Sequence, residues 1–342
     1  MSELVLPRLD TVPRSRRQGF EDTAASYGMS VRQGRDRSMR VLERAHERAQ
    51  HLGLEEPLGK SFYEQQGEGQ QLDELARRTG VSREVAAMAV STTSTQMKWD
   101  QPERGGVPVY DRPNLRVAQH AIEEAHSGKP LGQVSRPPGF FSSDKTARTA
   151  AAEVRAVEAG QGAPYEVMHG GRRPTPSKER MKHSSFMQNW LQPGNPANRA
   201  TMDVWESRIQ APHLRKEVLD QARGAAGPYL VMDEANRRAS EAYGLTPEQG
   251  QAVKWFEARN FGAIQPQDRG RARGSARRAG VPDSRLHLPD TGDQAWEAKV
   301  PDIGPTNPRQ FADERGVWLQ GDPKGSRGRR VNRLVFSERA DW

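Results

Sequence analysis

The spacing of apolar and polar residues along the chain is mostly that of α-helices. In the clearest stretches, apolar residues recur every three or four positions, which places them on one helix face. Leu42, Ala45 and Ala49 show this spacing within residues 37–52, and residues 114–126 repeat it. The same pattern, bounded by Gly, Pro or capping residues, predicts helices over residues 72–89, 146–160, 177–190, 202–209, 234–243 and 246–260. The sequence therefore predicts an all-α protein.

The helical pattern weakens toward both ends of the chain. Residues 1–30 lack periodicity and contain Arg14-Ser15-Arg16-Arg17, whereas residues 266–342 are rich in Gly, Pro and Arg. Gly and Pro together make up 56 of the 342 residues, which is above their usual share in folded domains. We therefore expect a single helical body over residues 31–265, a flexible basic arm over 1–30 and a basic, largely irregular tail over 266–342.

Charge and composition restrict the class of partner and exclude several kinds of site. The net charge of +8 favours an anionic partner, and DNA is the expected one. Cysteine is absent, which excludes disulfides, zinc ribbons and cysteine-ligated iron–sulfur clusters. No metal-binding or nucleotide-binding motif occurs, so no metal and no cofactor are expected. Long apolar runs and a signal-peptide pattern are also missing, which predicts a cytoplasmic protein without a membrane partner.

A cluster of arginines marks the start of the tail. Five of them occur within ten residues among Gly, Ala and Ser: Arg269, Arg271, Arg273, Arg277 and Arg278. Arginines in this setting cannot pack a core, so they form either a solubilising tail or a phosphate-binding arm. We expect them to contact nucleic acid, with an affinity that depends on salt and not on base sequence.

Residues 72–83 resemble a bacterial helix-turn-helix. Ala76 lies four residues before the turn residue Gly80, as close packing of the two helices requires, and Val81 follows the turn. The second helix then runs through Ala87-Met88-Ala89-Val90, which is too apolar to lie in a major groove. Two interpretations remain, a DNA-reading motif and an ordinary helix pair inside a core, and the composition favours the second.

The stretch from Ala200 to Arg208 places one carboxylate in an apolar frame. Asp203 lies between Met202 and Val204 at the start of an expected helix. An Asp in this position either caps the helix or takes part in chemistry. A second unusual stretch, Ser94 to Trp99, follows the apolar helix of the helix-turn-helix pattern.

Four elements of the chain, in order, resemble uncharacterised proteins of actinobacteria and their phages. They are Ser94 to Trp99, Lys182 to Asn189, Thr201 to Trp205 and Gly244 to Trp255, and the resemblance spans residues 37–260. More distantly, the layout resembles the helix-hairpin-helix base-excision DNA glycosylases. That resemblance implies a glycosylase-like fold and matches Gln96, Lys182 and Asp203 to three site positions of the family.

The glycosylase resemblance implies a definite chemistry. Asp203 would stabilise the sugar cation that forms as a flipped base leaves, and Lys182 would be the nucleophile. Gln96 would approach the opened base stack, and Trp99 and Asn189 would be further substrate-binding residues. The chain departs from the family because residues 176–181 lack the glycine-rich hairpin that holds phosphate. The alternative is therefore a non-enzymatic nucleic-acid-associated or phage assembly protein that keeps only the fold.

Overall fold

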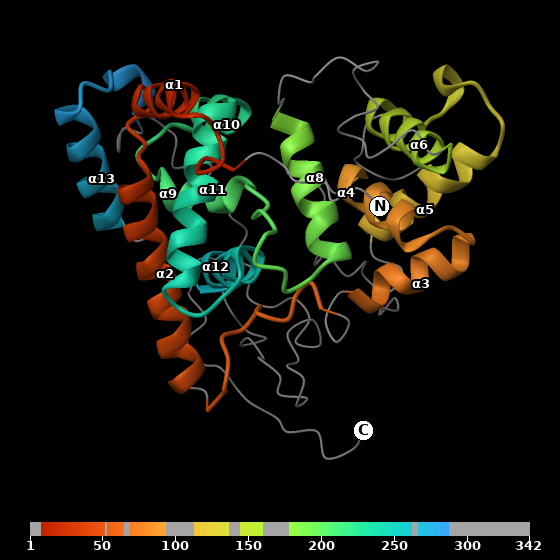
Figure 1. Cartoon of the computed structure of the whole chain (residues 1–342), viewed down its shortest axis with the longest axis horizontal. Helices are drawn as coiled ribbons and strands as arrows, with labels where there is room; N and C mark the ends of the chain where they lie inside the picture. The colour runs from red at the N-terminus through yellow and green to blue at the C-terminus, as the bar shows by residue number, and fades with distance from the viewer. Residues whose placement is uncertain are drawn as a thin grey trace, which may run out of the picture. The chain divides into compact units, whose positions relative to one another are not determined.

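The computed structural model of the protein describes residues 8–51, 53–64, 69–93, 113–136, 144–159, 178–261 and 266–286. Within these ranges the chain forms twelve α-helices and no β-strand (Figure 1). The only extended pairing among them is an isolated antiparallel bridge between Leu214 and Leu286. The all-α class expected from the sequence is confirmed.

The chain divides into two compact units. The described part of residues 62–198 forms the first unit, and the described parts of residues 6–61 and 199–342 form the second. The chain thus leaves the second unit after its first two helices and returns to it at Arg199. This differs from the single body expected over residues 31–265, because helical periodicity identifies helices without showing which of them share a core.

The first unit is built around a buried central helix. Its members are α3 (Gln70–Thr79), α4 (Arg83–Thr93), α5 (Pro113–His126), α6 (Asp144–Glu158), α8 (Lys178–Leu191) and the short 3-10 helix η3 (Leu131–Gln133). Helix α4 packs against α3, α5, α6 and α8, and every residue from Val85 to Thr93 is buried. Several of these residues are alanines, which allow the neighbouring helices to approach closely.

Aromatic side chains complete the core of the first unit. Trp190 on α8 is 1% exposed and lies against Phe62, Tyr63 and Phe186, with ring centroids 5.1–5.6 Å apart. All three pairs are edge-on or tilted, which are the arrangements that aromatic quadrupoles favour. Trp190 therefore has the core role that is usual for a helical tryptophan.

The second unit surrounds another central helix. Its members are α1 (Arg14–Ala25), α2 (Val31–His51), α9 (Val204–Gln210), α10 (Lys216–Gly224), α11 (Ala226–Glu241), α12 (Pro247–Phe261), α13 (Pro266–Arg278) and the 3-10 helix η4 (Asp283–Arg285). Helix α11 packs against α1, α2, α10 and α12. It meets α12 so closely that a Cβ built on Gly250 would lie 1.9 Å from Ser240 Oγ.

Two helices lie in segments for which the sequence predicts irregular structure. Residues 14–25 form α1, which packs against α11, so this part of residues 1–30 is not a flexible arm. The arm is also not basic, because residues 1–30 contain four arginines and four acidic residues. Residues 266–278 of the tail form α13. Few of the side chains that the structure describes on these two helices are buried, so their helical pattern is faint in the sequence.

Candidate functional site

The predicted arginine cluster lies on α13, which has one apolar side and one basic side. Ala272 and Ala276 are 4% and 3% exposed, and Ala276 joins a small core with Val281 and Leu286. On the solvent side the exposed residues of the cluster are Arg271, Arg277 and Arg278, with Arg273 half-buried. Arg269 lies in the helix too, but its side chain is outside the described residues. The cluster is thus held on a folded helix.

The segment that follows α13 fixes this helix to the second unit. Leu286 pairs with Leu214, and Arg215 donates its backbone N–H to the Arg285 carbonyl at 3.1 Å. The Arg285 guanidinium donates to the Ser26 carbonyl at 2.7 Å and lies over the Tyr27 ring, 5.0 Å from its centroid. Residues 266–286, called the basic segment below, therefore form an integral part of the second unit.

Glycine is required where the basic segment meets the end of α1. Gly28 has φ of 68°, in the left-handed region that favours glycine. A Cβ at this position would lie 2.8 Å from Val281 and 3.2 Å from Ala276. The end of α1 and the basic segment are thus in direct contact.

The charge of the basic segment is only partly compensated. It contains six arginines and two aspartates, and hence half of the chain's net charge of +8. Arg277 pairs with Asp283 at 2.7 Å. Arg271 and Arg278 have no ion-pair partner within the part of the chain that the structure describes, although Arg278 donates to Ser275. These two guanidinium groups remain available to an anion.

Arginines on the first unit are arranged differently. On α3, Arg77 and Arg78 both contact Glu74, at 2.7 Å and 2.6 Å. The two guanidinium groups lower the pKa of Glu74 to about 2. Because their charges are satisfied within the helix, this surface is less suited to an anionic partner than α13.

Asp203 is the N-cap of α9. Its Oδ1 accepts a hydrogen bond from the backbone N–H of Glu206 at 2.8 Å, and its backbone is extended as a cap requires. Asp203 and Glu206 are spaced as in a capping box, in which the glutamate would reach back to the cap. Here the Glu206 side chain enters the interior, so the capping interpretation of Asp203 holds and Glu206 has another role.

Glu206 forms a buried ion pair with Lys254 on α12. The side chains are 1% and 0% exposed, and the Lys254 ammonium group also donates to Ser38 Oγ on α2 at 3.1 Å. Gln210 donates to the same carboxylate at 2.7 Å. Burial lowers the pKa of Lys254, while Glu206 and, more weakly, Asp203 raise it. The arrangement links α2, α9 and α12 by one charged contact.

This buried pair has the residue types of a Schiff-base site, but a substrate could not reach its lysine. A lysine with a lowered pKa near carboxylates is a common nucleophile. Lys254, however, has no exposed surface, and its ammonium group is already bound to Glu206 and Ser38. Its geometry therefore indicates a structural contact in the core.

Two further predicted site residues belong to a different unit from Asp203. Lys182 and Asn189 are on α8 of the first unit, with Lys182 half-buried and Asn189 fully buried, whereas Asp203 belongs to the second unit. Burial and then the Lys182 charge lower the pKa of the neighbouring His183 to about 3. Gln96 and Trp99 lie outside the described residues. The catalytic grouping of these residues stays a prediction.

The helix-turn-helix pattern forms as expected but does not present a reading helix. Gly80 ends α3 in the left-handed conformation with φ of 70°, and α4 begins at Arg83. All residues of α4 from Val85 onward are buried by the other helices of the unit. The DNA-reading alternative is therefore wrong for α4, and the helix pair belongs to a core.

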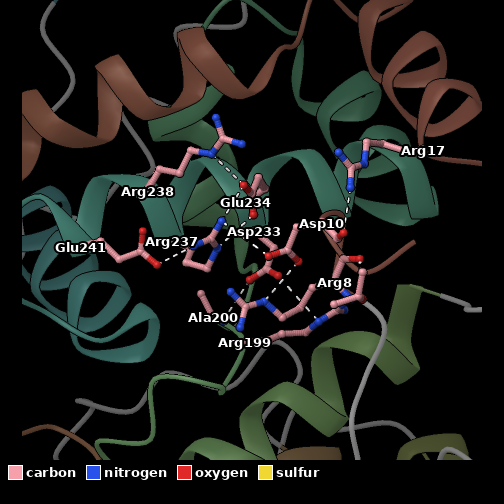
Figure 2. Close-up of polar contacts among 11 residues, drawn as sticks. Arg8, Asp10, Arg17, Arg199, Ala200, Asp233, Glu234, Arg237, Arg238 and Glu241 are labelled. Atoms are coloured by element: carbon pink, nitrogen blue, oxygen red, sulfur yellow. Dashed lines mark hydrogen bonds and ion pairs between the residues drawn. The ribbon is translucent and has the colours of Figure 1, made fainter. Parts of the chain in front are cut away.

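A second charged network, which the sequence did not reveal, surrounds α11 (Figure 2). Asp233 accepts a hydrogen bond from the backbone N–H of Ala200 at 3.1 Å and lies 3.6 Å from the Arg199 guanidinium. Both charged side chains are buried, with 8% and 1% exposed. Burial raises the pKa of Asp233, and Arg199 opposes that shift.

The outer part of this network links Asp10 and Arg17 to α11. Glu234 pairs with Arg237 and Arg238, both at 2.7 Å, and Arg237 lies 3.8 Å from Asp10 (Figure 2). Arg17 on α1 donates to the Asp10 carbonyl at 2.7 Å. Since most of these arginines face a carboxylate, the network is structural and not an anion site.

The sequence carried a faint signal for these buried charges. Asp233-Glu234 follows Leu230-Val231-Met232, and Lys254 lies between Val253 and Trp255. A charged residue inside an apolar run is either an interruption of the core or a paired group within it. The sequence alone did not show the partners, which are distant along the chain.

Over the described ranges, fold and site together define an all-α protein with buried ion pairs and a basic surface helix, α13. Within the described residues, no helix is long and apolar enough to span a membrane, and no group of three or more acidic or histidine side chains could hold a metal ion. The chain belongs to a family of unknown function, DUF7178, whose model matches residues 22–261. No curated protein and no solved structure matches it. The family match contains Asp203, Glu206 and Lys254 and ends before α13.

Proposed function

We propose that the protein binds nucleic acid, with duplex DNA as the expected form, through contacts between α13 and the phosphate backbone. The observation that carries the proposal is the exposure of Arg271 and Arg278 without an ion-pair partner in the described chain. Guanidinium groups bind phosphate oxygens through planar, charge-assisted hydrogen bonds. The role is one of binding, and base chemistry is not part of it.

The distribution of charge supports this assignment. The basic segment carries a net charge of +4 in 21 residues, whereas residues 287–342 contain nine basic and nine acidic residues. Ala272 and Ala276 hold α13 against the second unit, so its arginines are positioned before a ligand arrives. Preorganised groups lose less conformational entropy on binding than those of a flexible tail.

The described chemistry supports binding over base removal. Asp203 already accepts a hydrogen bond from the Glu206 backbone N–H as a helix cap, and Lys254, whose pKa Asp203 raises, is fully buried. A glycosylase would need a carboxylate and a nucleophile that a flipped nucleotide can reach. A nucleic-acid-associated or assembly role requires neither.

The test is the binding of a fluorescent 30-base-pair duplex, measured by anisotropy over a salt series. A variant with Arg271→Gln, Arg277→Gln and Arg278→Gln should bind more weakly. The slope of its log affinity against log salt concentration should be smaller in magnitude by about 2 to 3, because each lost phosphate contact removes about 0.9 from that slope. The change should be the same for duplexes of unrelated sequence, since phosphate contacts carry no sequence information.

The matched control removes the same charge elsewhere. Arg77→Gln, Arg78→Gln and Arg116→Gln replace three arginines of the first unit, each with solvent exposure, and should leave the affinity and the slope nearly unchanged. Equal weakening in both triple variants would mean that only net charge matters and would overturn the assignment to α13. Salt-independent binding, or none, would overturn the proposed function itself.

A further inference from the structure

His213 is buried at the point where the basic segment meets the rest of the second unit. It lies in the turn after α9, is 1% exposed, and its Nε2 is 2.9 Å from the Tyr27 carbonyl oxygen. A carbonyl oxygen only accepts hydrogen bonds, so Nε2 carries the proton of the neutral ring. Nδ1 therefore has no proton, and it has no hydrogen-bond partner within the described chain.

Three segments converge on this histidine. A Cβ on Gly28, at the end of α1, would lie 3.2 Å from His213 Nε2, 3.2 Å from Ala276 and 2.8 Å from Val281. Directly after His213, Leu214 forms the bridge to Leu286. The ring is thus enclosed by α1, by its own turn and by the basic segment.

The charged groups around His213 do not favour a positive charge on its ring. Arg37 on α2 opposes protonation, Arg215 follows the turn, and Arg285 binds the Ser26 carbonyl beside Tyr27. On the basic segment, the carboxylate of Asp283 is paired with Arg277. Burial first and then Arg37 lower the pKa of His213 to about 4, although its bond to Tyr27 raises it.

We propose that protonation of His213 releases the basic segment from the second unit. The added proton would place an N–H at Nδ1, which has no hydrogen-bond partner in the described structure, and a positive charge on a ring that is 1% exposed. Release lets the ring reach solvent and separates Leu286 from Leu214. The consequence for ligand binding rests on the proposed function. At neutral pH α13 is held against the second unit with its arginines in fixed positions, and in acid it is released.

The direction and size of the effect follow from linkage. The pKa of His213 is about 4 in the docked state and close to the ordinary 6.5 after release. The released state therefore binds more protons between these values, so docking is strongest above pH 6.5 and weakens as the pH falls toward 4. At pH 5.0 the equilibrium shifts toward release by about 30-fold relative to pH 7.5.

The experiment uses the absence of native cysteine. In full-length protein carrying Ala272→Cys, the single thiol is buried when α13 is docked. Its rate of reaction with 4,4′-dithiodipyridine is compared with that of a free cysteine peptide at the same pH. The rate for the peptide divided by the rate for the protein is the protection of the thiol, and it reports the equilibrium between the docked and released states. The protection should fall by about 30-fold from pH 7.5 to pH 5.0. Equal protection at the two values would overturn the proposal.

Three further variants isolate the histidine. His213→Gln keeps an amide N–H for the Tyr27 carbonyl but cannot be protonated, and its protection should be independent of pH. Arg285→Gln loses the contact with Ser26, so the basic segment should be released more often at every pH, while protection still falls by about 30-fold from pH 7.5 to pH 5.0. This variant tests the proposal if His213→Gln does not fold. Arg271→Gln, an exposed change on the same helix, should leave protection unchanged. The same loss of protection in His213→Gln as in its parent would overturn the proposal.

The two proposals fail separately. Absence of duplex binding at pH 7.5 would remove the nucleic-acid function and leave the thiol protection unaffected. Conversely, thiol protection that does not depend on pH would remove the histidine switch while duplex binding at pH 7.5 persisted.

Discussion

Lys254 and Glu206 form an ion pair inside the second unit, with side chains 0% and 1% exposed. The pair joins α12 to α9, and the contact of Lys254 with Ser38 adds α2. Burying two charges costs free energy that their attraction offsets only when the geometry is close and further hydrogen bonds are made. Lys254 and Gln210 both donate to Oε1 of Glu206, whereas Oε2 has no hydrogen-bond partner among the described residues.

We predict that breaking this pair from one side strongly destabilises the second unit. Lys254→Met leaves Glu206 as a buried carboxylate without its counter-ion, and Glu206→Gln does the reverse. Each should lower the free energy of unfolding by about 3–5 kcal/mol, as for other buried pairs that lose one partner. Urea unfolding followed by circular dichroism measures the effect.

The double variant Lys254→Met with Glu206→Leu provides the control. Without either charge, the site needs only apolar packing, so the double variant should be more stable than each single variant. Additive losses would show that the two residues act independently, contrary to their contact. Arg238→Gln, which removes a half-exposed arginine from the Glu234 network, should change stability by less than about 1 kcal/mol.

A second prediction separates capping from catalysis at Asp203. Asn caps a helix about as well as Asp, so Asp203→Asn should unfold at nearly the same urea concentration as the parent, whereas Asp203→Ala should cost about 1 kcal/mol. Neither change should alter binding to DNA. An assay of base release on duplexes with damaged or modified bases completes the test. Release by the parent and its loss by at least about 100-fold in Asp203→Asn would restore the catalytic interpretation.

The sequence predicted those features that depend on local spacing. The helix expected at residues 114–126 is α5 (Pro113–His126), and the one with Thr246 at its start is α12 (Pro247–Phe261). Both carry a clear apolar face and recognisable ends. Helix α10 was not predicted, because it is short and Leu219 and Ala222 are its main buried apolar residues.

Features that depend on contacts between distant residues could not be predicted. Lys254 and Glu206 are 48 positions apart, and neither has a neighbour in sequence that indicates the other. The division into two units is hidden for the same reason, since α2 shares a core with α11 and α12 and not with the α3 that follows it. For Asp203, the sequence left capping and catalysis open; the hydrogen bond from the Glu206 backbone N–H shows the cap, and a catalytic role stays a prediction.

A third prediction concerns two glycines that both lie within helices. A Cβ at Gly250 would lie 1.9 Å from Ser240 Oγ and 2.7 Å from its Cβ, so Gly250→Ala forces α11 and α12 apart. At Gly274 the nearest atom is Arg278 Nη1 at 3.6 Å, so Gly274→Ala meets no obstacle. Thermal unfolding should show destabilisation by at least about 2 kcal/mol for the first. The second should show stabilisation by about 0.5–1 kcal/mol, because Ala is the better helix former. Similar changes of the same sign would contradict the close approach at Gly250.

The last prediction compares two truncations that end on either side of the basic segment. Removing residues 287–342 leaves α13 and Leu286 in place and does not change the net charge, because nine basic and nine acidic residues are lost. This protein should keep both its unfolding transition and its salt-dependent affinity for duplex DNA.

Removing residues 266–342 takes four positive charges with α13 and uncovers Gly28, His213 and Leu214. It should bind DNA at least about 10-fold more weakly and with a flatter salt dependence, since phosphate contacts are lost. It should also be less stable, because the apolar contacts of Ala276 and Leu286 are lost. Full binding by the shorter protein would assign the DNA contacts to surfaces other than α13, and loss of binding by the longer one would assign them to residues 287–342.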